Sequence, residues 1–155
     1  MQRLIVPLRT DVALRPAPIE PAWIIEGDPT ACNCVLSYGS DRQALTIVWE
    51  CTEGKFDWRY DFDETIHFLE GSVVIESETM APTRFGAGDV LFLARGAHAR
   101  WTVEKKVRKL AFCHTPAPAP LSLLLKALAR LARRTRRARA GARRQPALSL
   151  RGSAH

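Results

Sequence analysis

The chain has 155 residues, of which 46% are hydrophobic and 25% charged, and this composition excludes a chain that is disordered throughout. No apolar run approaches the roughly 18 residues that a membrane-spanning helix needs, and residues 1–14 lack the apolar core of a secretory signal. The net charge of +7 averages two unlike parts, because residues 1–120 carry −3 and residues 121–155 carry +10. We therefore expect a mildly acidic domain followed by a basic tail.

The first segment, residues 1–20, is rich in proline and predicts an irregular arm. From there to residue 114, short runs of β-branched and aromatic residues alternate with turn signals. Strands are predicted over residues 45–49, 56–60, 64–70, 72–76, 90–93, 100–103 and 107–113. Turns or breaks are predicted at residues 53–54, 61–63, 71, 85–89 and 95–96, with a loop around Pro82.

This spacing of strands indicates the fold class. No helical periodicity of any length occurs before residue 120, and many short strands at regular spacing favour an all-β fold over a βαβ fold. Closure would remove the exposed edges, so we expect a small antiparallel β-barrel over residues 21–114. Residues 115–120, with three prolines, predict a stiff linker at its end.

The basic tail, residues 121–155, changes to a helical period. Leucines at 121, 124, 125, 128 and 131 share one side of a helical wheel, which predicts a short amphipathic helix of about three turns. Three interpretations stay open for residues 121–144: binding to an anionic membrane surface, binding to nucleic acid, or a solvated extension.

Four cysteines are few for a chain long enough to build its own core, and we expect free thiols in a reducing, cytoplasmic compartment. Cys32 and Cys34 are spaced as a C-x-C pair, but no second pair follows at the spacing of a zinc site.

Two motifs carry a family resemblance. Residues 54–71 resemble the first cupin motif, and residues 85–101, with a Gly-Asp turn and a later Gly-containing turn, resemble the second. Over about residues 40–114 the chain is similar to the cupin subfamily named for (S)-ureidoglycine aminohydrolase, which includes ethanolamine-utilisation-like cupins. The resemblance implies a cupin jelly roll (RmlC-like) and a homodimer.

The resemblance also identifies what this chain lacks. Metal-binding cupins hold a divalent ion with three histidines and a glutamate. Aligned on Glu64, the histidine positions are Trp58, Tyr60 and Ala99, so only the glutamate is retained. Indole and methyl groups cannot ligate a metal. We expect no metal cofactor. If a metal is bound, the resemblance implies a divalent ion such as Mn, Fe or Zn.

Strand alternation places the aromatic residues and the glutamate together, provided that Glu64 points inward as its cupin counterpart does. The expected ligand-binding residues are Trp58, Tyr60, Glu64, Ile66, Phe68 and Trp101. They would form an aromatic cup suited to a small, flat or cationic organic ligand. The alternative interpretation is that the aromatic residues fill the barrel as ordinary core.

Glu64 and Tyr60 are the candidate catalytic residues. A carboxylate in an apolar barrel should have a raised pKa, which suits general acid–base chemistry. The alternative is a buried carboxyl group that hydrogen-bonds to Tyr60 or to the backbone. Strand parity places His67 and His98 away from Glu64, and neither they nor His114 are expected to be ligands.

Three functional hypotheses follow. The first is a cupin that binds a small organic molecule in a barrel with a degraded metal site, with or without weak acid–base catalysis. The second is a metal-dependent cupin enzyme resembling ureidoglycine aminohydrolase. The third is a barrel tethered to a membrane or nucleic acid by its basic tail. Whether the protein is an enzyme stays open at this point.

Overall fold

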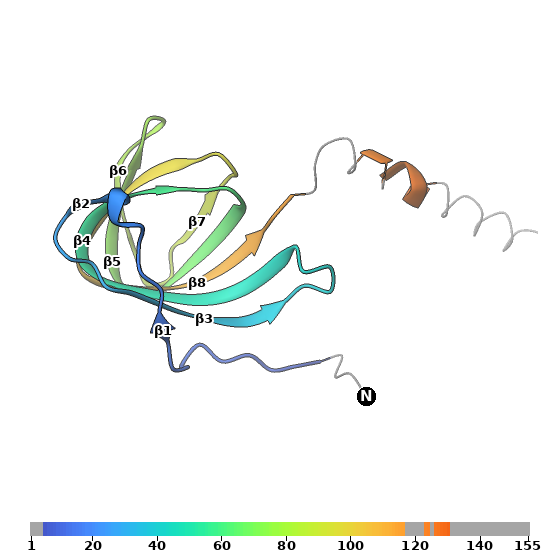
Figure 1. The fold of residues 1–155 in the computed structure, drawn as a ribbon, viewed down its shortest axis with the longest axis horizontal. Coiled ribbons are helices and arrows are strands. Elements are labelled where there is room, and N and C mark those ends of the chain that lie inside the picture. The colour runs from blue at the N-terminus through green and yellow to red at the C-terminus, as the bar shows by residue number, and fades with distance from the viewer. Residues whose placement is uncertain (1–4, 117–122, 125, 131–155) are drawn as a thin grey trace, which may run out of the picture. The chain divides into compact units, whose positions relative to one another are not determined.

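The computed structural model describes residues 5–116, 123–124 and 126–130 of the chain (Figure 1). Residues 1–116 and residues 117–155 form separate units, and the first contains every strand described here. The strands are β1 (Arg15–Pro16), β2 (Ile24–Glu26), β3 (Ala31–Tyr38), β4 (Ala44–Arg59), β5 (Asp63–Ser77), β6 (Met80–Gly86), β7 (Val90–Leu93) and β8 (His98–His114). A 3-10 turn, η1 (Pro21–Trp23), precedes β2.

Three long strands organise the barrel. β8 pairs antiparallel with β4 along one side and with β5 along the other. β3 and β2 pair with the first and second halves of β4, while β7 and β6 pair in the same way with the two halves of β5. The sheet therefore curls around a common interior, as the ribbon shows (Figure 1). This antiparallel jelly-roll barrel confirms the predicted all-β fold class.

The predicted breaks at residues 53–54 and at residue 71 are wrong. β4 and β5 run through both positions, and the register shifts there instead, as in a β-bulge. Gly71 has φ +74°, and a Cβ at this position would lie 1.9 Å from the carbonyl oxygen of Lys106 on β8. A glycine signals a bend as well as a turn, because both need backbone conformations or close approaches that a side chain prevents.

Two further breaks that the sequence predicted also lie inside continuous strands of the structure. Residues 98–114 form one strand, β8, where two strands were predicted. The predicted loop around Pro82 is part of β6, which pairs only with β5 at the edge of the sheet, where proline is tolerated. β7 and the turn at residues 95–96 agree with the prediction.

Aromatic residues fill the centre of the barrel. Phe56 on β4 and Trp101 on β8 are cross-strand partners, and their rings stack with centroids 6.1 Å apart. Phe68 of β5 contacts Trp101 from the other neighbouring strand. All three side chains are buried, and fully burying one such ring contributes about 1.5–3 kcal/mol.

The N-terminal arm is more ordered than the sequence predicts. Its strand β1 pairs with β3, and Ile19 is buried in the barrel core. On the outer face, the Arg108 guanidinium donates to the carbonyl oxygens of Thr10 (2.6 Å) and Val12 (3.5 Å). The proline-rich composition did not indicate these contacts, because they depend on strands that follow much later in the chain.

The described part of the basic tail, residues 123–124 and 126–130, is helical, and Leu123, Leu124 and Leu128 are exposed. The rest of the predicted amphipathic helix lies outside the described residues. None of the described residues belongs to a helix long and apolar enough to cross a membrane.

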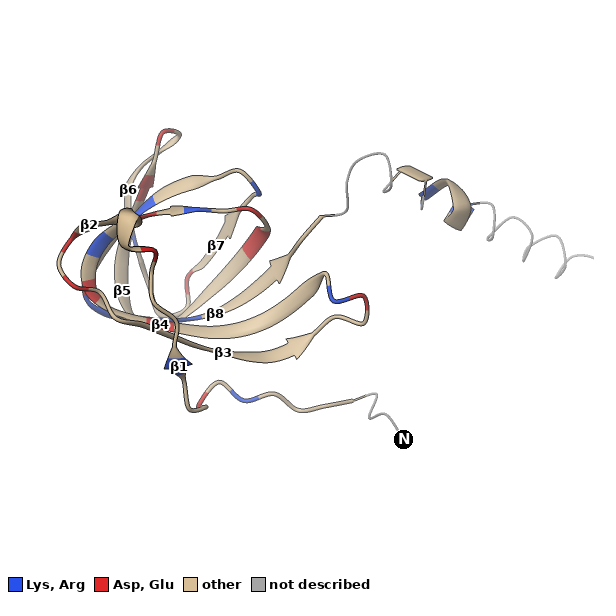
Figure 2. Ribbon diagram, viewed as in Figure 1, with Lys and Arg blue, Asp and Glu red and all other residues tan. Residues whose placement is uncertain are grey.

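In the barrel, the turn between β3 and β4 carries both an acidic and a basic residue, Asp41 and Arg42 (Figure 2).

Candidate functional site in the barrel cavity

An open cavity of about 410 Å³ lies inside the barrel and is called the barrel cavity here. Its walls come from β3, β4, β5 and β8, together with the arm and the turn after β3. The lining residues are Ala17, Pro18, Asn33, Arg42, Gln43, Leu45, Ile47, Trp49, Trp58, Phe62, Glu64, Lys109, Cys113 and Thr115. Most of these side chains are apolar or aromatic, and Glu64 is the only acid among the described lining residues.

Glu64 faces the interior from β5 and is only 4% exposed. It is not an isolated carboxylate, because the Lys109 ammonium group donates a hydrogen bond of 2.6 Å to its Oε1 atom. Lys109 is itself 7% exposed. The expectation of a lone carboxylate in an apolar barrel is therefore wrong, and the polar centre of the cavity is a buried ion pair.

The register of β8 explains why Lys109 reaches Glu64. Lys109 is paired with Trp49 on β4 and Phe68 on β5, while Glu64 is paired with Cys113, two inward-facing positions further along β8. The inward residue between them, Ala111, has only a methyl group. The lysine side chain can therefore extend along the strand toward the carboxylate.

Two indole rings surround the ammonium group. The Lys109 Nζ atom lies 5.0 Å from the centroid of the Trp49 ring and 4.8 Å from that of the Trp101 ring. Attraction between a cation and an aromatic face reaches about 2 kcal/mol or more when the pair is shielded from water. The carboxylate and the two indoles together offset the cost of burying a charged lysine.

Trp58 forms the centre of the aromatic wall of the cavity. Its ring meets those of Trp23 and Trp49 edge to face, with centroids 5.4 and 6.0 Å apart. Its cross-strand partner on β8 is Ala99, whose small side chain leaves room for the indole. Two of the three positions aligned with the histidines of metal-binding cupins are thus filled by a bulky ring and the small residue opposite it.

Of the six predicted ligand-binding residues, the structure places Trp58 and Glu64 on the cavity wall. The other four are buried in the barrel core and do not line the cavity: Tyr60, Ile66, Phe68 and Trp101. Trp101 still acts on the site through Lys109, whose ammonium group lies over its ring. Alternation alone could not separate these two groups, because both face the same side of their strands.

The Tyr60 phenol and the Cys113 thiol are two further groups whose reactivity depends on protonation. Burial raises the pKa of the Tyr60 phenol well above its ordinary value, and the negative charge of Glu64 raises it further. The phenol therefore stays protonated at neutral pH. Burial likewise raises the pKa of the Cys113 thiol, on the cavity wall, to about 12, and the charge of Glu64 contributes. A thiol with this pKa is a poor nucleophile near pH 7.

The donor set of the cavity does not fit the divalent ion that many cupins hold. The Glu64 carboxylate is paired with Lys109, and the positions aligned with histidine carry an indole, a buried phenol and a methyl group. In the described residues no three His, Cys, Asp or Glu side chains are grouped as metal ligands. The side chains of the cavity therefore do not suit chemistry that depends on such an ion.

The histidines lie elsewhere. His98 is exposed, and its Nε2 atom is 3.6 Å from the Asp57 carboxylate, which also accepts hydrogen bonds from Arg100. The hydrogen bonds from Arg100 are the main reason why the pKa of Asp57 is lowered from its ordinary value. His67 is not among the residues that line the barrel cavity.

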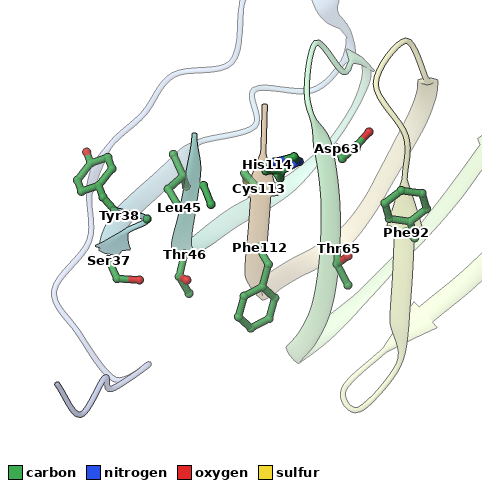
Figure 3. A pocket seen from close by; sticks show the side chains of 12 residues that line it. Ser37, Tyr38, Leu45, Thr46, Asp63, Thr65, Phe92, Phe112, Cys113 and His114 are labelled. Atoms are coloured by element: carbon green, nitrogen blue, oxygen red, sulfur yellow. The ribbon is translucent and has the colours of Figure 1, made fainter. Parts of the chain in front are cut away.

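A second hollow, of about 520 Å³, lies between the ends of β3, β4, β8, β5 and β7 (Figure 3). Figure 3 shows Phe112 pointing to the same side as Thr46 and Thr65. Phe112, Phe92 and Tyr38 are exposed, and His114 is also in the lining. Its single acid, Asp63, already accepts a hydrogen bond from the backbone N–H of Arg95. The barrel cavity offers more specific polar chemistry, so we take it as the candidate site.

Sequence reasoning missed Lys109, the residue that sets the charge of the site. In residues 107–113, apolar residues occupy both faces of the strand, and Leu110 and Phe112 are more hydrophobic than Lys109 and Ala111. The alternation therefore did not indicate which face is inside. A signal was available, because Trp101 was expected to face inward and residue 109 has the same parity. The sequence predicted two separate strands at residues 100–103 and 107–113, however, so the alternation was not carried from one to the other, whereas the structure joins them in β8.

An antiparallel jelly-roll barrel with an open interior cavity is the architecture of the cupins, the class that both sequence motifs resemble. Residues 38–111 match the family model of the EutQ-like cupin domain. No curated protein sequence matches the chain.

Solved structures with this fold come from several bacteria. A protein of unknown function of the DUF861 family from Pseudomonas syringae pv. tomato is 26% identical, with a TM-score of 0.63. The match covers 68% of this chain and 46% of that one, so the chain spans less than half of the Pseudomonas protein. The putative ethanolamine utilization protein Q from Salmonella typhimurium is 21% identical, over 57% of this chain and 72% of its own, with a TM-score of 0.50. The polyketide cyclase RemF from Streptomyces resistomycificus is 20% identical, over 76% and 82%, with a TM-score of 0.53. The last two likenesses show the fold alone.

Proposed function

We propose that this protein binds a small organic molecule in the barrel cavity. The observation that carries the proposal is the buried Glu64–Lys109 ion pair, which lies on the wall of an open, aromatic-lined cavity. Ligand sites are commonly apolar concavities with a few convergent polar groups. A cavity of about 410 Å³ suits a ligand of one or two rings.

A matched pair of variants tests this proposal. Trp58→Ala removes the central ring of the cavity wall, whereas His98→Ala removes a residue on the outside of the barrel. We expect small aromatic compounds that bind the unmodified protein to bind Trp58→Ala at least about tenfold more weakly, a loss of about 1.4 kcal/mol. Binding to His98→Ala should be unchanged.

Ligand-observed NMR on a library of small aromatic and heteroaromatic compounds would give the hits, and titration would rank the three proteins. Equal losses in the two variants, or a greater loss in His98→Ala, would show that the ligand does not occupy the barrel cavity.

The metal-dependent alternative, an enzyme resembling ureidoglycine aminohydrolase, stays a prediction of the sequence resemblance. It would need ligands other than the residues at the aligned histidine positions. Metal analysis of the purified protein decides this alternative: stoichiometric Mn, Fe or Zn that is lost in Glu64→Ala would replace our proposal. Acid–base catalysis by Glu64 and Tyr60, a homodimer and a cytoplasmic location are likewise predictions.

A further inference from the structure

The barrel cavity is close to charge-neutral at the Glu64–Lys109 pair, and this restricts what can bind there. Glu64 and Lys109 are both buried and cancel one another's charge. The one other ionisable lining residue with a formal charge is Arg42, which is exposed, with its guanidinium 5.6 Å from the centroid of the Tyr38 ring. An ionised ligand group at the pair would therefore bring an uncompensated charge into a poorly solvated place, which is costly.

The ion pair nevertheless has unused hydrogen-bonding capacity. An ammonium group has three N–H donors, and a carboxylate accepts at both oxygens. Among the described residues, Lys109 Nζ donates to Glu64 Oε1, and neither Lys109 Nζ nor Glu64 Oε2 has a further hydrogen-bond partner. The pair thus offers a donor and an acceptor side by side on the cavity wall.

The walls around the pair determine the shape of the ligand. Trp49, Trp58 and Phe62 line the cavity together with the aliphatic side chains of Leu45 and Ile47. Aromatic walls favour flat ligands, which can stack on a ring or meet its edge.

From these observations, and given the proposed function, we infer that the cavity selects a neutral aromatic or heteroaromatic amide. The amide carbonyl accepts a hydrogen bond from the Lys109 ammonium group, and the amide N–H donates to the free oxygen of Glu64. The flat body lies against the indole of Trp58. An amide satisfies both members of the pair without adding charge, whereas a carboxylate only accepts and an amidinium only donates.

Benzamide, benzoate and benzamidinium are probes that isolate this property. They share one ring and nearly one shape, and at pH 7 they are neutral, negative and positive. In calorimetric titrations of the full chain, we expect benzamide to bind at least about tenfold more tightly than either charged probe. The same titrations on Trp58→Ala should show weaker binding of all three.

Two variants change the charge of the pair in opposite directions. Glu64→Gln leaves an ammonium group without its counterion, so benzoate should become the tightest probe. Lys109→Met leaves the carboxylate alone, so benzamidinium should become the tightest. Circular dichroism checks that each variant is folded. If Lys109→Met does not fold, the double variant with Glu64→Gln replaces it and should show no preference for either charged probe.

The possible results separate the two proposals. Tighter binding of benzoate or benzamidinium than of benzamide to the unmodified protein overturns the inference, as does an unchanged order in Glu64→Gln. Binding that does not respond to Trp58→Ala, or no binding of any probe, counts against the barrel cavity as the ligand site and so against the proposed function as well.

Discussion

Lys109 is the residue whose position most changes the interpretation of this barrel. With Glu64 alone, the interior would attract cations, and the sequence led to that expectation. The ammonium group at 2.6 Å from Glu64 Oε1, with indoles on two sides, removes that preference. Burying two paired charges contributes little net stability compared with apolar residues of the same size, because desolvation opposes their attraction. Folding therefore gains little from this pair, which is consistent with the role in ligand recognition that we propose.

Removing one member of this pair should be strongly destabilising. Lys109→Met leaves a buried carboxylate without a counterion, which typically costs about 3–5 kcal/mol. We expect a correspondingly lower free energy of unfolding in urea, measured at pH 7. The double variant Glu64→Gln/Lys109→Met should recover at least half of that loss, because no buried charge remains. Additive losses in the double variant would show that the two side chains do not act as a pair.

At the scale of elements, the long strands β4, β5 and β8 bend through register shifts instead of ending at turns. This continuity brings Phe56 and Trp58 on β4 to the same interior as Trp49, which precedes the shift at residues 52–54. Gly71 lies at the matching register shift in β5, where the carbonyl oxygen of Lys106 occupies the space that a Cβ would need. The bends thus build the cavity as well as the fold.

Two glycines with similar backbone angles test the importance of the bend. Gly71 and Gly88 have φ of +74° and +93°, but a Cβ at Gly88 would meet nothing within 4 Å. Gly88→Ala should cost about 1–3 kcal/mol from backbone strain alone. Gly71→Ala adds a clash with backbone and should cost more, by at least about 1–3 kcal/mol. Urea denaturation of both variants measures the difference, and equal stabilities would mean that β5 can relax around the added methyl group.

At the scale of the whole molecule, the charge is divided along the chain. Residues 1–120 carry −3 and the remaining residues +10, so any affinity for anionic membranes or nucleic acid is expected to come from the tail. That role stays a prediction, since residues 131–155 lie outside the described part of the chain. The barrel cavity, by contrast, is lined by residues between Ala17 and Thr115.

A truncated chain of residues 1–116 should therefore keep ligand binding. It contains every lining residue of the cavity and every described strand. We expect its affinity for benzamide to match that of the full chain within about twofold, which corresponds to less than about 0.5 kcal/mol. A loss of tenfold or more, in protein shown by circular dichroism to be folded, would mean that the tail contributes to the site.

The sequence by itself determined the all-β class and the approximate place of most strands. These properties are local, since they depend on residue type and on the two-residue period of a strand. The inward position of Glu64 and the absence of histidine at the three aligned positions followed through the family resemblance.

Only the tertiary structure decided which inward residues line the cavity and which fill the core. Trp58 lies on β4 and Tyr60 directly after its end, and alternation predicts the same face for both, yet Trp58 borders the cavity and Tyr60 is buried in the core. The structure likewise decided that Lys109 faces inward, since both faces of residues 107–113 carry apolar residues and only the structure joins this segment to Trp101 in one continuous strand, β8. The charge of the site depends on contacts between residues 45 positions apart, which a pattern of neighbours in sequence does not contain.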